Sequence, residues 1–245
     1  MSMVEKSWLV LDAFAPGGGP VRLDELARRS GLPRSTVHRL LTRLVEVGSV
    51  ERRADGFHLG RKLFELGAIV PVERGLRNAA LPFMEDLYIA THEAVHIGVM
   101  DNLDVVYVEK IYGHGVFAMP SRVGGRLPLT CTAIGRAMLA HAAPEFVETV
   151  LAQPLRRLTP HSVTDPVRLA ENLAEVQLSG VAYECEEVQL GGGSLAAPVF
   201  DSGRVVAALS VAVPVERFQP VRLAPAVKTA ALALSRQLGK SCRRA

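Results

Sequence analysis

The sequence has few cysteines and no long hydrophobic run. Its three cysteines, Cys131, Cys185 and Cys242, are odd in number and far apart in the chain. That arrangement argues against a disulfide framework and against a paired-cysteine zinc site, and it is typical of a chain in a reducing compartment. No stretch of eighteen consecutive apolar residues is present, so we expect no membrane-spanning helix. The first residues, MSMVEKSWLVLDAF, include acidic side chains and no cleavage pattern, so we expect no signal peptide and a cytoplasmic location.

The chain also has no net charge outside its N-terminal part. Over all 245 residues the formal charge is +3. Residues 1–75 contain twelve Lys and Arg against nine Asp and Glu, whereas residues 76–245 contain sixteen of each. A length of 245 residues with 49% hydrophobic side chains is enough for two modest domains with packed cores. A basic N-terminal part joined to a neutral remainder suggests a DNA reader coupled to a sensor or a catalyst.

Residues 22–60 form the most informative segment. LDELARRS carries apolar residues at helical spacing and is followed by Gly31, a residue typical of helix C-termini. From about Arg34, apolar residues recur at i, i+3, i+4, i+7 and i+8, which predicts a second amphipathic helix. VERRADGFHL then alternates around Asp55 and Gly56, which predicts a β-hairpin. Two helices joined by a short turn and followed by a hairpin are the architecture of a winged helix-turn-helix.

The polar face of the second helix has the chemistry of a DNA reader. Arginines can contact phosphates or guanine edges, and hydroxyl and imidazole groups can hydrogen-bond to bases. Between residues 22 and 53 the chain has eight arginines and four acidic residues. A solvated basic face on an ordinary helix pair is the alternative, but the turn, the apolar stripe and the hairpin together favour DNA binding. The expected contacts are Arg34, Ser35, Thr36, His38, Arg39 and Arg43 on the helix, in the major groove, and Arg52 and Arg53 on the wing, at phosphates.

Helices are also predicted on both sides of this segment. A first helix over residues 5–14 has Val4, Trp8 and Leu11 on one face, and we expect that face to pack against the two helices that follow. After the wing, two helices interrupted at Pro71 are expected to link the domains. The second of them, over about residues 73–92, should kink or break at Pro82.

The rest of the chain has the pattern of an α+β domain. Strands in pairs with helices between them indicate a largely antiparallel sheet. We expect strands over residues 94–101, 104–112 and, more weakly, 116–120; a loop over 124–128; helices over 132–142, from 144, and over 166–179; a strand over 181–187; a loop over 191–193; a hairpin of 194–200 and 204–213; and a closing helix over 221–238.

Three segments together resemble one protein family. ELARRSGLPRSTVHRLLTRLVEVGSVER, LPLTCTAIGRAMLA and APVFDSGRVVAALSVAVP are similar, in order and spacing, to the IclR family of bacterial transcriptional regulators. The resemblance covers almost the whole chain. It implies a winged helix-turn-helix over residues 1–62, a linker helix over residues 63–78 and an effector-binding domain over residues 79–245 with a GAF-like or profilin-like sheet. It also implies a homodimer or tetramer that binds operators near catabolic genes.

The resemblance further implies an effector site. In family members that bind small keto acids, apolar contacts match Val116, Met119 and Leu127, and backbone amides match Ala133 and Ile134 at a helix start, where an anion is favoured. Polar partners of the ligand match Glu184, Ser194, Ser210 and Ala212, where the family more often has Asp, Cys, Ser and Ser. Since Ala212 lacks a hydroxyl, we expect a larger or more aromatic ligand than a two- or three-carbon acid.

Two other interpretations of the C-terminal part remain open. It could mainly support oligomerisation, or it could be an enzyme with an appended DNA-binding domain. An enzyme needs a nucleophile, a base and an orienting group, and no histidine is spaced to form a recognisable pair with Cys131 or Cys185. His92 and His96 straddle a change from helix to strand, which spoils a metal-ligand pair, and His114 adds no recognisable ligand spacing. The glycine run at residues 191–193 lacks the lysine of a phosphate-binding loop.

We therefore expect a DNA-binding transcriptional regulator that is not an enzyme and needs no cofactor or metal. Its expected partners are a double-stranded DNA operator with an inverted repeat, a small organic effector and further copies of itself, and no membrane. An inverted repeat follows because one small winged helix reads few base pairs, and two-fold pairing doubles the contacts. The apolar faces around Trp8 and along residues 63–76 are candidate dimer contacts.

Overall fold

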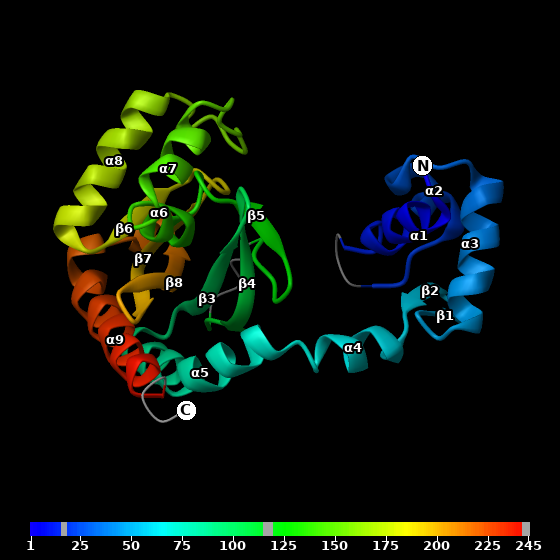
Figure 1. Ribbon diagram of the computed structural model, residues 1–245, viewed down its shortest axis with the longest axis horizontal. Coiled ribbons are helices and arrows are strands. Elements are labelled where there is room, and N and C mark those ends of the chain that lie inside the picture. Colours follow the sequence, from blue (N-terminus) through cyan, green and yellow to red (C-terminus); the bar gives the residue numbers. More distant parts are fainter. Residues whose placement is uncertain (16–18, 115–119, 242–245) are drawn as a thin grey trace. The chain divides into compact units, whose positions relative to one another are not determined.

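The computed structural model describes residues 1–15, 19–114 and 120–241 (Figure 1). The chain divides into two compact units, Met1–Arg74 and Gly75–Ala245. The division falls in the first turn of helix α5 (Pro71–Thr91). None of the described helices is long and apolar enough to cross a bilayer.

The first unit is a cluster of three helices followed by a hairpin and a short helix. The apolar stripe of the third helix is buried at Val37, Leu40, Leu41 and Leu44, so the face predicted from its periodicity is the one that packs in the core. Gly31 has φ +67°, a left-handed conformation that glycine adopts without strain, and it ends the second helix there. The elements are α1 (Met3–Asp12), α2 (Leu23–Ser30), α3 (Arg34–Glu46), β1 (Val50–Arg53), β2 (Gly56–Leu59) and α4 (Arg61–Gly67).

The hairpin is the predicted wing, and it is fixed to the helices. β1 and β2 are antiparallel, with Arg53 opposite Gly56 at the turn. Val21, just before α2, forms a bridge to Phe57 with N···O distances of 2.9 and 3.0 Å. The wing is therefore held on its outer edge by the chain segment that leads into α2.

The prediction for the first helix is wrong in its buried face. Val4 and Trp8 are 67% and 58% exposed, and Leu11 is only partly buried. Val10 and Phe14 are buried instead. The segment has apolar residues at helical spacing on more than one face of the helix. Because Val10 and Phe14 pack in the core, the face with Val4 and Trp8 is turned to solvent.

The second unit is built on one six-stranded antiparallel sheet. The strand order is β5-β4-β3-β8-β7-β6, so the two hairpins β3–β4 and β7–β8 lie at the centre and join through β3 and β8. The strands are β3 (Ala94–Asp101), β4 (Asp104–Ile111), β5 (Arg126–Pro128), β6 (Ala182–Cys185), β7 (Gly192–Asp201) and β8 (Arg204–Pro214).

Helices cover both faces of this sheet (Figure 1). α5 and α9 pack on one face through Met84, Leu87 and Leu234. α6 packs on the other through Ile134 and Met138, with α7 and α8 over it. This second face holds the candidate ligand site. The helices are α6 (Ala133–Leu139), α7 (Pro144–Leu151), α8 (Pro166–Ser179) and α9 (Pro220–Ser241), with a 3-10 turn at Val215–Arg217.

Four local expectations are corrected or left untested by the structure. Leu127 lies in a short strand rather than a loop, because it pairs with Val105 of β4. Gly193 also lies in a strand, β7, where a Cβ would approach the Phe218 ring to 2.7 Å. The glycine there permits a close ring contact and does not mark a loop. The weak strand expected at 116–120 lies almost wholly outside the described residues, and α5 continues through Pro82 without a break.

Candidate functional site

The first unit presents the predicted polar face of α3 to solvent. Ser35, His38, Arg39 and Arg43 are exposed, and Thr36 is half-buried. They lie on the side of the helix opposite the buried stripe. In the part of the chain that the structure describes, the guanidinium of Arg39 has no ion pair or hydrogen bond. A free arginine on an exposed helix face is available for a base edge or a phosphate.

The other basic side chains of this surface have weak partners. Arg34 pairs with Asp24 at 2.5 Å and Arg43 with Glu46 at 2.8 Å, with the arginine side chains 68% and 75% exposed. Exposed pairs of this kind contribute only about 0–1 kcal/mol, so a phosphate can replace the carboxylate.

The wing carries the two remaining arginines. Arg53 pairs with Glu51 at 2.7 Å, and the Arg52 guanidinium lies 5.9 Å from the centre of the Phe57 ring. Both arginines are exposed. The ring holds the Arg52 side chain along the hairpin through a cation–π contact and leaves its charge accessible.

In the second unit, a small cavity lies between the sheet and the start of α6. Its lining comes from four strands, from the first turn of α6 and from two loops. It contains His96, Tyr107, Ser121, Thr132, Ala133, Ile134, Val188, Ser194, Ser210 and Ala212.

The first turn of α6 is pressed close to the preceding chain. A Cβ at Gly135 would lie 1.9 Å from the carbonyl oxygen of Leu129, so only glycine fits at this position. Thr132 caps the helix by accepting the Gly135 N–H at 3.0 Å. The amides of Ala133 and Ile134 precede the first helical hydrogen bond and have no partner within the helix.

The cavity brings together part of the effector site that the resemblance implies. Ala133, Ile134, Ser194 and Ser210 line it, and so does Ala212. Leu127 does not; it is half-buried in the apolar core beneath α6. Val116 and Met119 lie outside the described residues. Glu184 lies behind Ser194 and is 1% exposed.

Two hydroxyls at the cavity have no partner. Tyr107 and Ser210 are 6% and 3% exposed, and neither side chain makes a hydrogen bond to any described residue. These two groups are therefore available to a polar ligand. Burial and the nearby Glu184 charge raise the pKa of Tyr107 well above its usual value, so the phenol stays protonated.

A short hydrogen-bonded chain fixes the histidine of the cavity. Lys110 Nζ donates to Ser121 Oγ at 3.2 Å, and Ser121 Oγ lies 2.8 Å from His96 Nε2. Burial and the Lys110 charge lower the pKa of His96 to about 3, so the imidazole is neutral. The direction of the hydrogen bond between Ser121 and His96 depends on which ring nitrogen carries the proton of the neutral imidazole.

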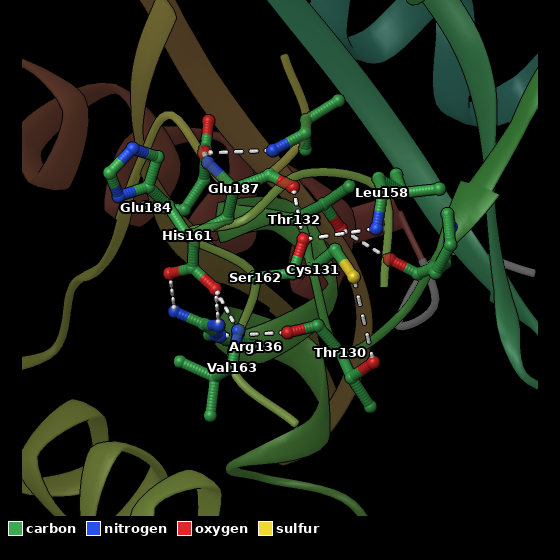
Figure 2. Close-up of polar contacts among 12 residues, drawn as sticks. Thr130, Cys131, Thr132, Arg136, Leu158, His161, Ser162, Val163, Glu184 and Glu187 are labelled. Carbon is green, nitrogen blue, oxygen red and sulfur yellow. Dashed lines mark hydrogen bonds and ion pairs between the residues drawn. The ribbon is translucent and has the colours of Figure 1, made fainter. Parts of the chain in front are cut away.

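Below the cavity a buried ion pair ties α6 to the chain after β6 (Figure 2). Arg136 and Glu187 are bidentate, with Nη1···Oε1 at 2.7 Å. Arg136 also donates to the Thr130 carbonyl at 2.9 Å, and Glu187 Oε2 accepts from the Val163 amide at 2.9 Å. The fork geometry of arginine suits such a site and holds the α6 start against the sheet.

Sequence reasoning missed His96, Tyr107, Ser121 and Thr132. A signal existed for the first two, because each interrupts an apolar strand on the face that α6 covers. The cysteines and histidines considered for other chemistry do not assemble: Cys131 is buried, Cys185 is exposed, and no cluster of metal-binding side chains is found among the described residues.

Family models match both units. Residues 3–54 match the IclR helix-turn-helix domain, and residues 70–236 match the bacterial transcriptional regulator IclR C-terminal domain. The HTH-type transcriptional regulator XynR of Escherichia coli is 31% identical over 243 residues, covering 96% of each chain. The transcriptional repressor IclR of Escherichia coli is 32% identical and covers 87% of this chain and 80% of its own.

Solved structures give the same result. An IclR homolog from Microbacterium hydrocarbonoxydans, complexed with 4-hydroxybenzoate, has a TM-score of 0.86 and 32% identity over 97% of this chain and 99% of its own. The Thermotoga maritima IclR has a TM-score of 0.77 and 29% identity over 96% and 98%. The relatives are named regulators and repressors, in agreement with the prediction of a DNA-binding regulator that is not an enzyme. The chain belongs to the IclR family of bacterial transcriptional regulators.

Proposed function

We propose that binding of this regulator to its operator is controlled by a small aromatic carboxylic acid held in the cavity beneath α6. The observation that carries the proposal is the pair of buried hydroxyls, Tyr107 and Ser210, that line the cavity without a partner. Convergent polar groups beside apolar side chains, as in this cavity, are typical of small-molecule sites.

The lining favours an acid with an apolar body. The first-turn amides of Ala133 and Ile134, together with Ser194, suit the anionic end of a ligand. Tyr107 and the neutral His96 suit a flat ring with a polar substituent, and Ala212 leaves apolar room beside it. The homologous structure with 4-hydroxybenzoate supports the same chemical class.

The cavity has a volume of about 10 Å³, far below the roughly 300–1,000 Å³ of typical small-molecule sites. A ring-sized ligand enters only if lining side chains move apart. Part of its binding free energy therefore offsets the cost of a change of conformation. A ligand shifts a conformational equilibrium by its differential affinity for the two states. This is the means by which an effector alters operator affinity.

For the DNA side, we propose that α3 enters the major groove and the wing lies along the backbone. Ser35, Thr36, His38 and Arg39 read base edges. Arg34, Arg43, Arg52 and Arg53 contact phosphates. The exposed positions of these side chains and the weak partners of the arginines support this assignment.

We further propose a homodimer or a dimer of dimers on an inverted repeat in the cytoplasm, with residues 1–62 reading DNA, 63–78 linking and 79–245 binding effector. The exposed Trp8 and Phe64, 58% and 77% exposed, are candidate dimer contacts. Large exposed apolar side chains often mark an interaction surface.

The experiment is a thermal-shift titration of the full chain with 4-hydroxybenzoate, benzoate, pyruvate and glyoxylate. A native-state ligand at about 100 times its Kd stabilises by about 2.7 kcal/mol. We expect the two aromatic acids to raise the melting temperature, and Tyr107→Phe to reduce the 4-hydroxybenzoate shift. Stabilisation by the keto acids alone would contradict the aromatic assignment.

A further inference from the structure

Ser194 has one hydroxyl proton, and Glu184 determines where that proton points. The two residues are paired across β6 and β7, and Ser194 Oγ lies 2.8 Å from Glu184 Oε1. Ser194 lines the cavity, while Glu184 stands behind it. An ionised carboxylate only accepts hydrogen bonds. Ser194 must then donate to Glu184, and it presents only lone pairs to a ligand.

The second carboxyl oxygen of Glu184 already accepts two backbone hydrogen bonds. Oε2 accepts the amide N–H of Glu187 at 3.0 Å and that of Val188 at 3.4 Å. A proton on Glu184 is therefore placed on Oε1, where it faces Ser194. A protonated Glu184 donates to Ser194 Oγ, and the serine proton is released toward the cavity.

We propose that an anionic effector binds in this cavity together with one proton, taken up by Glu184, which converts Ser194 from a hydrogen-bond acceptor into a donor. This inference rests on the proposed effector site and adds that the protein takes up one proton when the ligand binds. A carboxylate has no proton to donate, so it can hydrogen-bond to Ser194 only when that serine is in its donor form. It is also repelled by a second carboxylate behind that serine.

The surrounding charges leave Glu184 as the group that titrates. Glu187 is neutralised by Arg136 of α6 in a bidentate pair. Burial raises the pKa of Glu184 to about 7, so both protonation states are accessible near neutrality. The other titratable or charged side chains near Glu184 lie on two sides. On the cavity side they are His96 and Tyr107; along the outer cleft, which Glu184 also borders, they are His161, Arg168, Glu175 and Cys185.

The first measurement is calorimetry of benzoate binding to the full-length protein, in buffers of different ionisation enthalpy. Benzoate stays ionised across the range used, so it contributes no proton of its own. Above about pH 7 we expect uptake of about one proton per bound benzoate, and an affinity that falls about tenfold per pH unit. Below about pH 6 the uptake should vanish because Glu184 is already protonated.

The second measurement repeats this with Glu184→Gln. The Gln carbonyl can accept the two amides and its NH2 group can donate to Ser194, which reproduces the protonated form. We expect no proton uptake and an affinity that changes by less than about twofold with pH. Glu148→Gln, an exposed residue of α7, is the matched control and should behave as wild type.

The outcomes separate this inference from the proposed function. Benzoate binding without proton uptake in the wild type overturns the proton linkage and leaves the effector site standing. Uptake that persists in Glu184→Gln also overturns it, because another group is then the acceptor. Absence of binding by benzoate and by 4-hydroxybenzoate at every pH contradicts the proposed effector class, and the linkage fails with it.

Discussion

At the level of single residues, the buried carboxyl of Glu184 links folding to pH. Its pKa is raised from 4.5 to about 7, chiefly by burial. The folded state therefore binds this proton more tightly than the unfolded chain. The resulting stabilisation is complete below the unfolded pKa and is lost as pH rises through the folded pKa.

From about pH 5 to about pH 8, we expect wild type to lose roughly 2–3 kcal/mol of unfolding free energy relative to Glu184→Gln. Denaturant unfolding of both proteins at several pH values measures the difference. Two pH profiles that run parallel would show that Glu184 does not carry this linkage.

A second prediction at this scale concerns the buried pair of Arg136 and Glu187. The Arg136 side chain is 3% exposed. Arg136→Met leaves Glu187 charged and buried, and we expect a loss of about 3–5 kcal/mol in unfolding free energy. Arg156→Met is the matched control, because Arg156 pairs with Asp104 with its side chain 61% exposed. That change should cost no more than about 1 kcal/mol. Equal losses in the two variants would contradict the importance of burial here.

At the level of elements, periodicity predicted the parts of the fold that bury one face. The stripe of α3, the β3–β4 and β7–β8 hairpins and the bounds of α8 were all predicted, because each is encoded within a short stretch of sequence. Gly193 was misread, since its strand is defined by pairing with Cys185 of β6 and with the distant Val213 of β8. The buried face of α1 was misread for a similar reason.

The candidate ligand site was predictable only in part. The family resemblance located the start of α6 and the serines of β7 and β8. It did not indicate His96 or Tyr107, whose approach to Ser210 depends on the pairing of β3 with β8 and of β3 with β4. Register between strands far apart in sequence is a tertiary property, and no local pattern of this chain specifies it.

The wing permits a prediction at the scale of one element. Arg52→Ala with Arg53→Ala removes two phosphate contacts, so operator binding should weaken for all sequences and log Kd should depend less steeply on log salt, by a slope of about 2. Arg39→Ala on α3 should instead relax preference at one base position, by about 1–3 kcal/mol. Anisotropy titrations at several salt concentrations measure both effects. A salt slope unchanged by the double substitution would show that the wing does not contact the backbone.

At the level of the whole molecule, we propose that a partner copy supplies the specificity that one basic reading unit lacks. Two-fold symmetry in the protein predicts an operator with two inverted half-sites, spaced by about one turn of DNA or a multiple of it. Footprinting gives the half-sites, and light scattering gives the mass in solution. A single asymmetric half-site bound by a monomer would rule out this arrangement.

The central claim is that occupation of the cavity beneath α6 controls operator binding. The most direct measurement is the operator Kd of full-length protein with and without saturating 4-hydroxybenzoate, in wild type and in Ala212→Ile, which fills the cavity from β8. The account predicts that the ligand changes the wild-type operator Kd by about tenfold, a coupling of about 1.4 kcal/mol, and changes that of Ala212→Ile by less than about twofold. An equal change in both proteins, or none in the wild type despite ligand binding, would contradict it.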